Sequence, residues 1–137
     1  MLAGIPLLIV PFILYNAGLA GLFGSGPAGD PWQTTVVSLS MMSGGVFTLT
    51  LGDLLIVVAL LLFFVEIVKA TRTGSASVID HLLSTFVFVA FLVEFLLMRG
   101  ATSSVFFILM VIALLDVLAG FSVSIRSANR DVTFGRD

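Results

Sequence analysis

Three carboxylates lie in or beside long apolar stretches of this sequence, where a charge is costly. Asp116 lies deep in one apolar run, Glu94 lies near the end of another, and Asp53 opens a third. A carboxylate at the centre of a membrane helix costs at least about 2.5 kcal/mol, so such residues are functional candidates by default. We therefore take Asp116, Glu94 and Asp53 as a candidate intramembrane site, either for a proton or ion or for helix packing.

Asp116 belongs to a narrow stripe of small or polar residues on an otherwise bulky helix. Ala113, Gly120 and Ser124 share its face at helical spacing. A small-residue stripe lets another backbone approach closely, so the carboxyl group near the bilayer midplane should point at protein rather than lipid. Two roles stay open: the group binds a proton or cation, or it forms a hydrogen bond that ties helices together.

Glu94 and Asp53 come from different apolar runs that would pack side by side. Antiparallel packing would bring Glu94 near the level of Asp53, and two carboxylates held close can bind a shared proton or a cation. The alternative is that Glu94 extends toward the membrane surface or pairs with Arg99 at the helix end.

Other charged residues are expected to serve the membrane boundary. Glu66 precedes Lys69 by one helical turn, so the two should form an ion pair at the interface. Asp80 opens the next apolar run, where a negative charge complements the helix dipole. We interpret its neighbour His81 as an interface residue rather than a ligand.

The composition excludes most catalytic and metal chemistry. The chain has no cysteine and one histidine, which rules out thiol catalysis and a haem held by two histidines of one chain. Neither the Glu-x-x-His nor the His-Glu-x-x-His spacing occurs. The net charge of −2 gives no reason to expect nucleic acid. We expect no enzymatic activity, no cofactor and no metal.

Four apolar segments must position these residues. Hydrophobic residues make up 59% of the chain and charged residues 10%, and the mean hydropathy is +1.23. Residues 2–23, 51–70, 78–98 and 103–125 each reach the ~20 residues that a transmembrane helix needs. They lack the alternation of barrel strands. The predicted fold is an all-α integral membrane protein, a four-transmembrane-helix bundle that forms a single domain over residues 1–137.

The first apolar segment has a competing interpretation. Gly18-Leu19-Ala20 resembles the small-residue cleavage site of a signal peptide, but no Lys or Arg precedes the apolar stretch, which is also longer than a usual signal core. We expect a transmembrane helix, kinked at Pro6 and Pro11.

Basic residues predict the orientation. The second connection, residues 69–77, carries Lys69 and Arg72, and the tail over residues 126–137 contains three arginines, whereas residues 24–50 contain no basic residue. Because cytoplasmic segments carry the excess of Lys and Arg, both termini should lie in the cytoplasm. We expect a multi-pass protein of the bacterial inner (plasma) membrane.

The first connection, over residues 24–50, is expected on the non-cytoplasmic side and carries the pattern of a short β-hairpin. Residues 35–41 and 46–51 alternate in polarity and are rich in β-branched or aromatic types, and Met42-Ser43-Gly44-Gly45 supplies a turn. The alternative is an interfacial loop lying flat on lipid. A lone hairpin is marginal in water, so the helix ends, the membrane surface or another chain must support it.

Four apolar residues of this connection are candidates for an interface or for docking a partner. Trp32 is a residue type favoured at the headgroup level, and the hairpin pattern contributes Val37, Leu39 and Phe47. Strand edges are also ready docking sites for another chain.

These features favour a non-catalytic membrane protein that acts by assembly, as an accessory subunit or as a homo-oligomeric scaffold. Its expected partners are the lipid bilayer and either a second copy or another membrane protein. The alternative is a proton- or cation-linked transporter or channel that uses the intramembrane carboxylates. The chain shows no internal repeat of the kind that many carriers use, which counts against this alternative.

Overall fold

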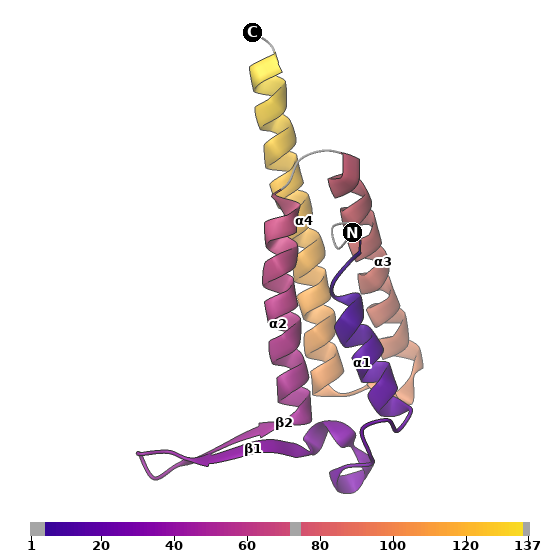
Figure 1. Ribbon diagram of the computed structural model, residues 1–137. Helices are drawn as coiled ribbons and strands as arrows, with labels where there is room; N and C mark the ends of the chain where they lie inside the picture. The colour runs from indigo at the N-terminus through magenta and orange to yellow at the C-terminus, as the bar shows by residue number, and fades with distance from the viewer. Residues whose placement is uncertain (1–4, 72–74, 136–137) are drawn as a thin grey trace.

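Helices side by side form a bundle, and a β-hairpin leaves one end of it (Figure 1). The computed structural model describes residues 5–71 and 75–135. Over these residues the fold is mostly helical, with four α-helices and one two-stranded sheet joined by short 3₁₀ turns. The helices are α1 (Ile9–Leu19), α2 (Leu51–Ala70), α3 (Ser75–Leu97) and α4 (Ser104–Gly135).

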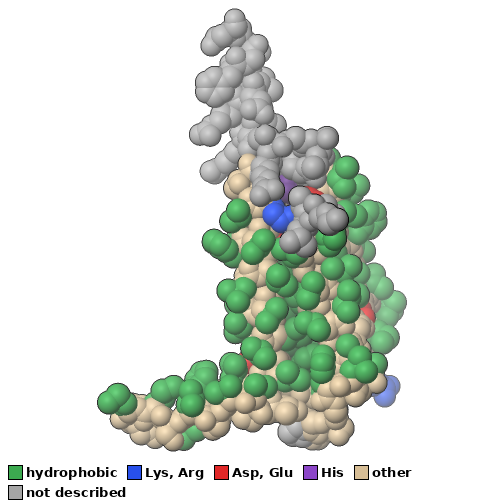
Figure 2. Space-filling view, viewed as in Figure 1, with side chains coloured by type: hydrophobic (Ala, Val, Ile, Leu, Met, Phe, Trp, Pro, Cys, Tyr) green, Lys and Arg blue, Asp and Glu red, His purple; other side chains and the backbone are tan. Residues whose placement is uncertain are grey.

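Three of the helices can cross a bilayer. The segments Leu51–Ala70, Val78–Leu97 and Ser104–Ser122 are long and apolar enough to do so. They confirm the second, third and fourth predicted segments. Hydrophobic side chains also cover the visible outer face of the bundle (Figure 2), as expected for a surface in contact with lipid.

Two of these helices extend beyond the predicted bounds. α3 begins at Ser75 rather than at residue 78, and α4 continues to Gly135 rather than ending at residue 125. No proline or glycine occurs between Phe121 and Phe134, so nothing in that stretch stops the helix. Arg72 and Arg136, used above to predict the orientation, lie outside the described residues.

The first predicted segment differs most from expectation. In place of a helix over residues 2–23, α1 has 11 residues and covers roughly 16 Å, about half of a bilayer core. The helix starts after Pro6 and ends before Gly21, whose φ of +92° leaves the helical region. Pro11 lies in the first turn, where its missing N–H breaks no intrahelical bond. Residues 1–4 lie outside the described part of the chain.

α4 lies at the centre of the packing, against both α2 and α3. Aromatic rings fill the core between them: Phe91 and Phe106 have centroids 5.3 Å apart, and Phe12 of α1 meets the edge of Phe91 at 5.0 Å. The hydroxyl of Tyr15 donates to the Gly100 carbonyl over 2.9 Å, which ties α1 to the connection between α3 and α4.

The predicted hairpin is confirmed. β1 (Thr35–Ser40) pairs antiparallel with β2 (Val46–Thr50), with a register shift near the start of β1. The turn is closed by the Met41 N–H, which donates to the Gly45 carbonyl over 2.8 Å. Gly44 takes a positive φ of +90° there, a conformation that glycine adopts at little cost.

A capping box joins the hairpin directly to α2. Asp53 N–H donates to Thr50 Oγ1 over 3.1 Å, and Thr50 N–H donates to Asp53 Oδ2 over 3.2 Å. This reciprocal pair satisfies two backbone donors at the start of the helix. Because no loop separates β2 from α2, the cap also sets the direction in which the hairpin leaves the bundle.

Candidate functional site

The last turns of α2 carry an ion pair inside the bundle. Lys69 Nζ lies 3.0 Å from Glu66 Oε1, and the two side chains are 9% and 5% exposed. The predicted pair is confirmed, but it is buried in the structure. A buried pair needs additional hydrogen bonds to offset the cost of removing two charges from water.

Those additional bonds come from the backbone that precedes α1. The Leu7 N–H donates to Glu66 Oε1 over 2.9 Å, and Lys69 Nζ donates to the Ile5 carbonyl over 2.8 Å. Backbone groups outside a helix must be satisfied by protein when lipid surrounds the bundle. The ion pair therefore provides hydrogen-bond partners for a backbone N–H and a backbone carbonyl that precede the short α1. These bonds hold the N-terminal segment against the end of α2.

Asp116 points from α4 toward α3. It is 6% exposed, and its side chain hydrogen-bonds to that of Ser84, which is 5% exposed. Ala113 and Gly120 on the same helical face are also buried. The prediction that Asp116 faces protein is therefore confirmed.

His81 also lies against α4 and is 7% exposed. A Cβ atom at Gly120 would lie 2.6 Å from His81 Nδ1, so only glycine leaves room for the imidazole there. Phe121 contacts the same ring, with centroids 5.7 Å apart. His81 was expected at the membrane boundary, but in the structure it is packed between α3 and α4.

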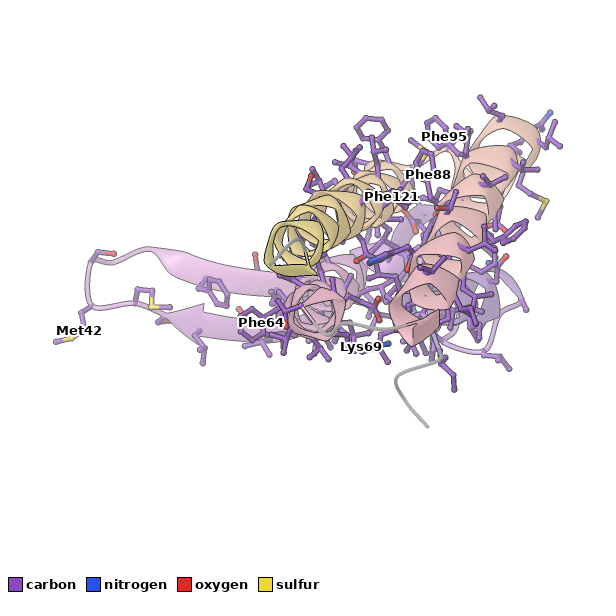
Figure 3. The ribbon with its side chains drawn as sticks, turned by 90° about the horizontal axis from the view of Figure 1, so that it is seen from above. Met42, Phe64, Lys69, Phe88, Phe95 and Phe121 are labelled. Atoms are coloured by element: carbon purple, nitrogen blue, oxygen red, sulfur yellow. The ribbon has the colours of Figure 1, made fainter. Side chains whose placement is uncertain are left out.

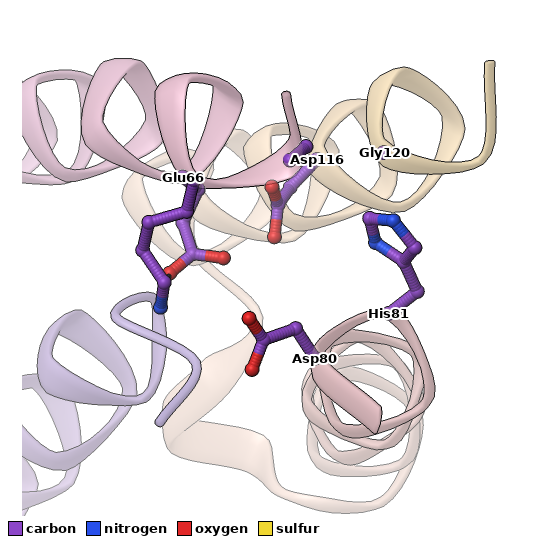
Figure 4. A pocket seen from close by; sticks show the side chains of 7 residues that line it. Glu66, Asp80, His81, Asp116 and Gly120 are labelled. Atoms are coloured by element: carbon purple, nitrogen blue, oxygen red, sulfur yellow. Dashed lines mark hydrogen bonds and ion pairs between the residues drawn. The ribbon is translucent and has the colours of Figure 1, made fainter. Parts of the chain in front are cut away.

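These side chains surround one small cavity, which Figure 4 shows from close by. Its volume is about 10 Å³, enough for the centre of one water molecule. Helices α2, α3 and α4 each contribute charged or titratable groups to it. We call this group the polar cluster; it is formed by Glu66, Lys69, Asp80, His81 and Asp116.

The polar cluster is rich in carboxyl groups. Three carboxyl groups face the cavity, from Glu66, Asp80 and Asp116, beside the ammonium of Lys69. Asp80 Oδ1 is buried and has no hydrogen-bond partner among the described residues. Uncompensated charge is expensive at low dielectric, so a bound proton or cation would stabilise this arrangement.

The other two carboxylates of the predicted site have different partners. Asp53 is exposed and forms the capping box with Thr50 at the far end of α2. Glu94 is half-buried near Asn16 of α1, whose amide Nδ2 donates to the Phe12 carbonyl over 2.9 Å, and Glu94 Oε2 has no partner among the described residues. Neither residue lines the cavity that contains Asp116.

Glu66, Asp80 and His81 were expected at the membrane boundary as separate residues, but in the structure they line one cavity with Asp116, and Ser84 is buried on the same helix as His81. A signal was present: Asp80, His81 and Ser84 are spaced so that a helix places them on neighbouring faces. Whether these residues lie near Asp116 depends on the orientation of α3 about its own axis relative to α4. Among the described residues, no group of three or more His, Asp or Glu side chains is placed to hold a metal ion.

The docking candidates of the first connection fall into two environments. Trp32 is 3% exposed and stacks on Tyr15 with centroids 5.0 Å apart, so its ring belongs to the core. On the hairpin, Leu39 is 53% exposed and Phe47 is 43% exposed, while Val37 is half-buried.

The chain matches no protein-family model and shows no significant similarity to a curated protein or to a solved structure.

Proposed function

We propose that the chain is a non-catalytic membrane protein that acts by assembly, as an accessory subunit or a homo-oligomeric scaffold. One observation carries the proposal: the hairpin projects sideways from the bundle (Figure 1), and within the described part of the chain β2 meets the helices at α2. Seen along the bundle, Met42 at its tip lies far from the helices (Figure 3). A lone two-stranded sheet is marginally stable, so another surface should complete it.

The edges of the hairpin suit a protein partner. Over residues 5–71 and 75–135 the sheet contains β1 and β2 only, so each strand has an outer edge that no other described strand pairs with. No charged residue occurs between Thr34 and Gly52, although soluble proteins commonly protect such edges with lysine or proline. Since the hairpin runs across the helix axes, a partner that pairs with these edges would lie in the same membrane.

The proposed topology has four passes, with both termini in the cytoplasm. The short α1 and the residues before it together make the first pass. The proposed first pass is supported by the hydrogen bond between Lys69 and Ile5, which brings the start of the described chain to the last turn of α2. Irregular backbone at membrane depth is tolerated where protein covers it, as Glu66 and Lys69 do here.

Proline substitutions at the strand edges test the assembly proposal. Counting from the bonded Met41–Gly45 pair, the ladder alternates so that the N–H groups of Ser38 and Thr48 point outward. Ser38→Pro and Thr48→Pro should therefore spare the hairpin while blocking strand addition at one edge each. We expect native mass spectrometry of gently extracted protein to show an assembly that at least one variant loses.

The masses distinguish the two forms of the proposal. A reproducible heteromeric mass identifies an accessory subunit, and a multiple of the chain mass identifies a scaffold. A monomeric wild type, or a wild-type assembly that persists in both proline variants, would contradict assembly through the hairpin edges.

A second candidate function is proton- or cation-linked transport through the polar cluster. It is favoured by three carboxyl groups that face one water-sized cavity between helices. In proteoliposomes loaded with a pH-sensitive dye, the wild type should then pass protons under an imposed potential. Asp116→Asn should abolish the flux, whereas the same change at the exposed Asp53 should not. Absence of flux in the wild type would leave the cluster with a purely structural role.

A further inference from the structure

The hairpin has one apolar face and one mainly polar face. The register places Val37 opposite Leu49 and Leu39 opposite Phe47 on one side of the sheet. The alternate pairs on the other side are Ser38–Thr48 and Ser40–Val46. We call the first set the apolar face; it consists of Val37, Leu39, Phe47 and Leu49.

The hydrophobic side chains of the hairpin gather mainly on the side from which the helices rise (Figure 2). The hairpin itself runs roughly across the helix axes at the end of the bundle where α2 begins (Figure 1). If α2 enters a bilayer at Leu51, the hairpin therefore lies along the membrane surface with its hydrophobic side turned toward the lipid.

The apolar face continues an existing lipid-facing surface. The adjoining part of α2 exposes Leu54 and Val57, at 36% and 43%. The capping box at Thr50 leads from the hairpin into this helix without an intervening loop, so the two apolar surfaces meet at a fixed corner. Acyl chains that cover the exposed side of α2 would also lie beneath the hairpin.

The composition of the hairpin fits this position. Residues 34–52 contain no charged side chain, and Met41 and Met42 at the turn are exposed. A segment free of charge can enter the boundary between headgroups and acyl chains without removing an ion from water. The serine and threonine hydroxyls on the opposite face would meet the hydrated headgroups.

We infer that the hairpin is an in-plane membrane anchor whose apolar face contacts the acyl chains of the leaflet that α2 enters. This contact supports a sheet that would be marginal in water and leaves its outer edges free. The inference requires that α2 crosses the membrane, and it does not depend on assembly.

Spin labels on neighbouring residues of β1 provide the test. The chain has no cysteine, so Leu39→Cys and its matched control Ser38→Cys each introduce a single labelling site on opposite faces. The labelled proteins are reconstituted in vesicles of phosphatidylcholine and phosphatidylglycerol. Collisions with oxygen, which concentrates in lipid, are compared with collisions with a water-soluble nickel complex. We expect the oxygen-to-nickel ratio at residue 39 to exceed that at residue 38 several-fold.

Two outcomes would overturn the inference. Equal access of nickel to both sites would mean that the hairpin extends into water. Protection of residue 39 from both reagents would mean that protein, such as a second copy, covers the face. Phe47→Cys and Thr48→Cys repeat the comparison on β2, so the test survives if one labelled variant fails to fold. Because the labels report lipid contact and the mass measurement reports assembly, failures of the two proposals are distinguishable.

Discussion

Gly18 lies directly against the ring of Trp32, which stacks in turn on Tyr15 with centroids 5.0 Å apart. A side chain at residue 18 would overlap the indole. This contact fixes the loop after α1 to the helix itself, and it accounts for the burial of a tryptophan that a membrane protein would often place at the headgroup level.

Gly18→Ala should destabilise the fold, because the added methyl group meets the indole in a packed site. Overpacking of this kind typically costs about 1–3 kcal/mol. Thermal unfolding in detergent can be followed by the fluorescence of Trp32, the only tryptophan. Gly45→Ala is the matched control, since a Cβ atom there would lie 3.6 Å from its nearest neighbour, Ser43 Oγ. Equal melting temperatures for the two variants would contradict the tight packing.

At the scale of elements, the N-terminal segment is held by charge rather than by helix length. α1 has 11 residues, and an isolated helix of that length is marginal. The backbone before it hydrogen-bonds to Glu66 and Lys69, which lie near the C-terminal end of α2. The end of α2 therefore anchors the N-terminal segment.

Glu66→Ala should detach this anchor, because the Lys69 ammonium and the Leu7 N–H would both lose their carboxylate partner. Breaking a buried pair by removing one member costs about 3–5 kcal/mol. Hydrogen exchange followed by mass spectrometry should show faster exchange in residues 5–12 than in the wild type. Glu66→Gln keeps an acceptor at the same position and should show a smaller effect; equal effects would argue against the carboxylate as the holding group.

At the scale of the whole molecule, orientation decides on which side of the membrane the hairpin and the polar cluster lie. The hairpin and the C-terminal end of α2 lie at opposite ends of the bundle (Figure 1). Lys69 and Arg72 should keep the second of these ends in the cytoplasm.

Single cysteines test this orientation in intact spheroplasts. An impermeant maleimide should label Ser43→Cys from outside, whereas Thr71→Cys should react only after lysis. Both positions are exposed, so accessibility within the fold does not explain a difference. The reverse pattern would invert the topology and place the hairpin at the cytoplasmic surface.

Local pattern determined much of this fold. Apolar length alone predicted the three candidate spans Leu51–Ala70, Val78–Leu97 and Ser104–Ser122. A helix suits such a stretch because it satisfies its own backbone hydrogen bonds in lipid. Alternation and turn residues predicted the hairpin, and the stripe around Asp116 predicted a carboxylate that faces protein. Each of these properties depends on neighbours in sequence, so the sequence carries it directly.

Tertiary structure decided the features that join distant segments. The N-terminal run was apolar enough to predict one long helix, but Pro6 and the bonds from Glu66 and Lys69 support a shorter one. The polar cluster formed because the rotation of α3 and α4 turned His81 and Asp116 toward the same cavity. Helical periodicity places a residue on a face, but only the packing of whole helices determines which faces meet.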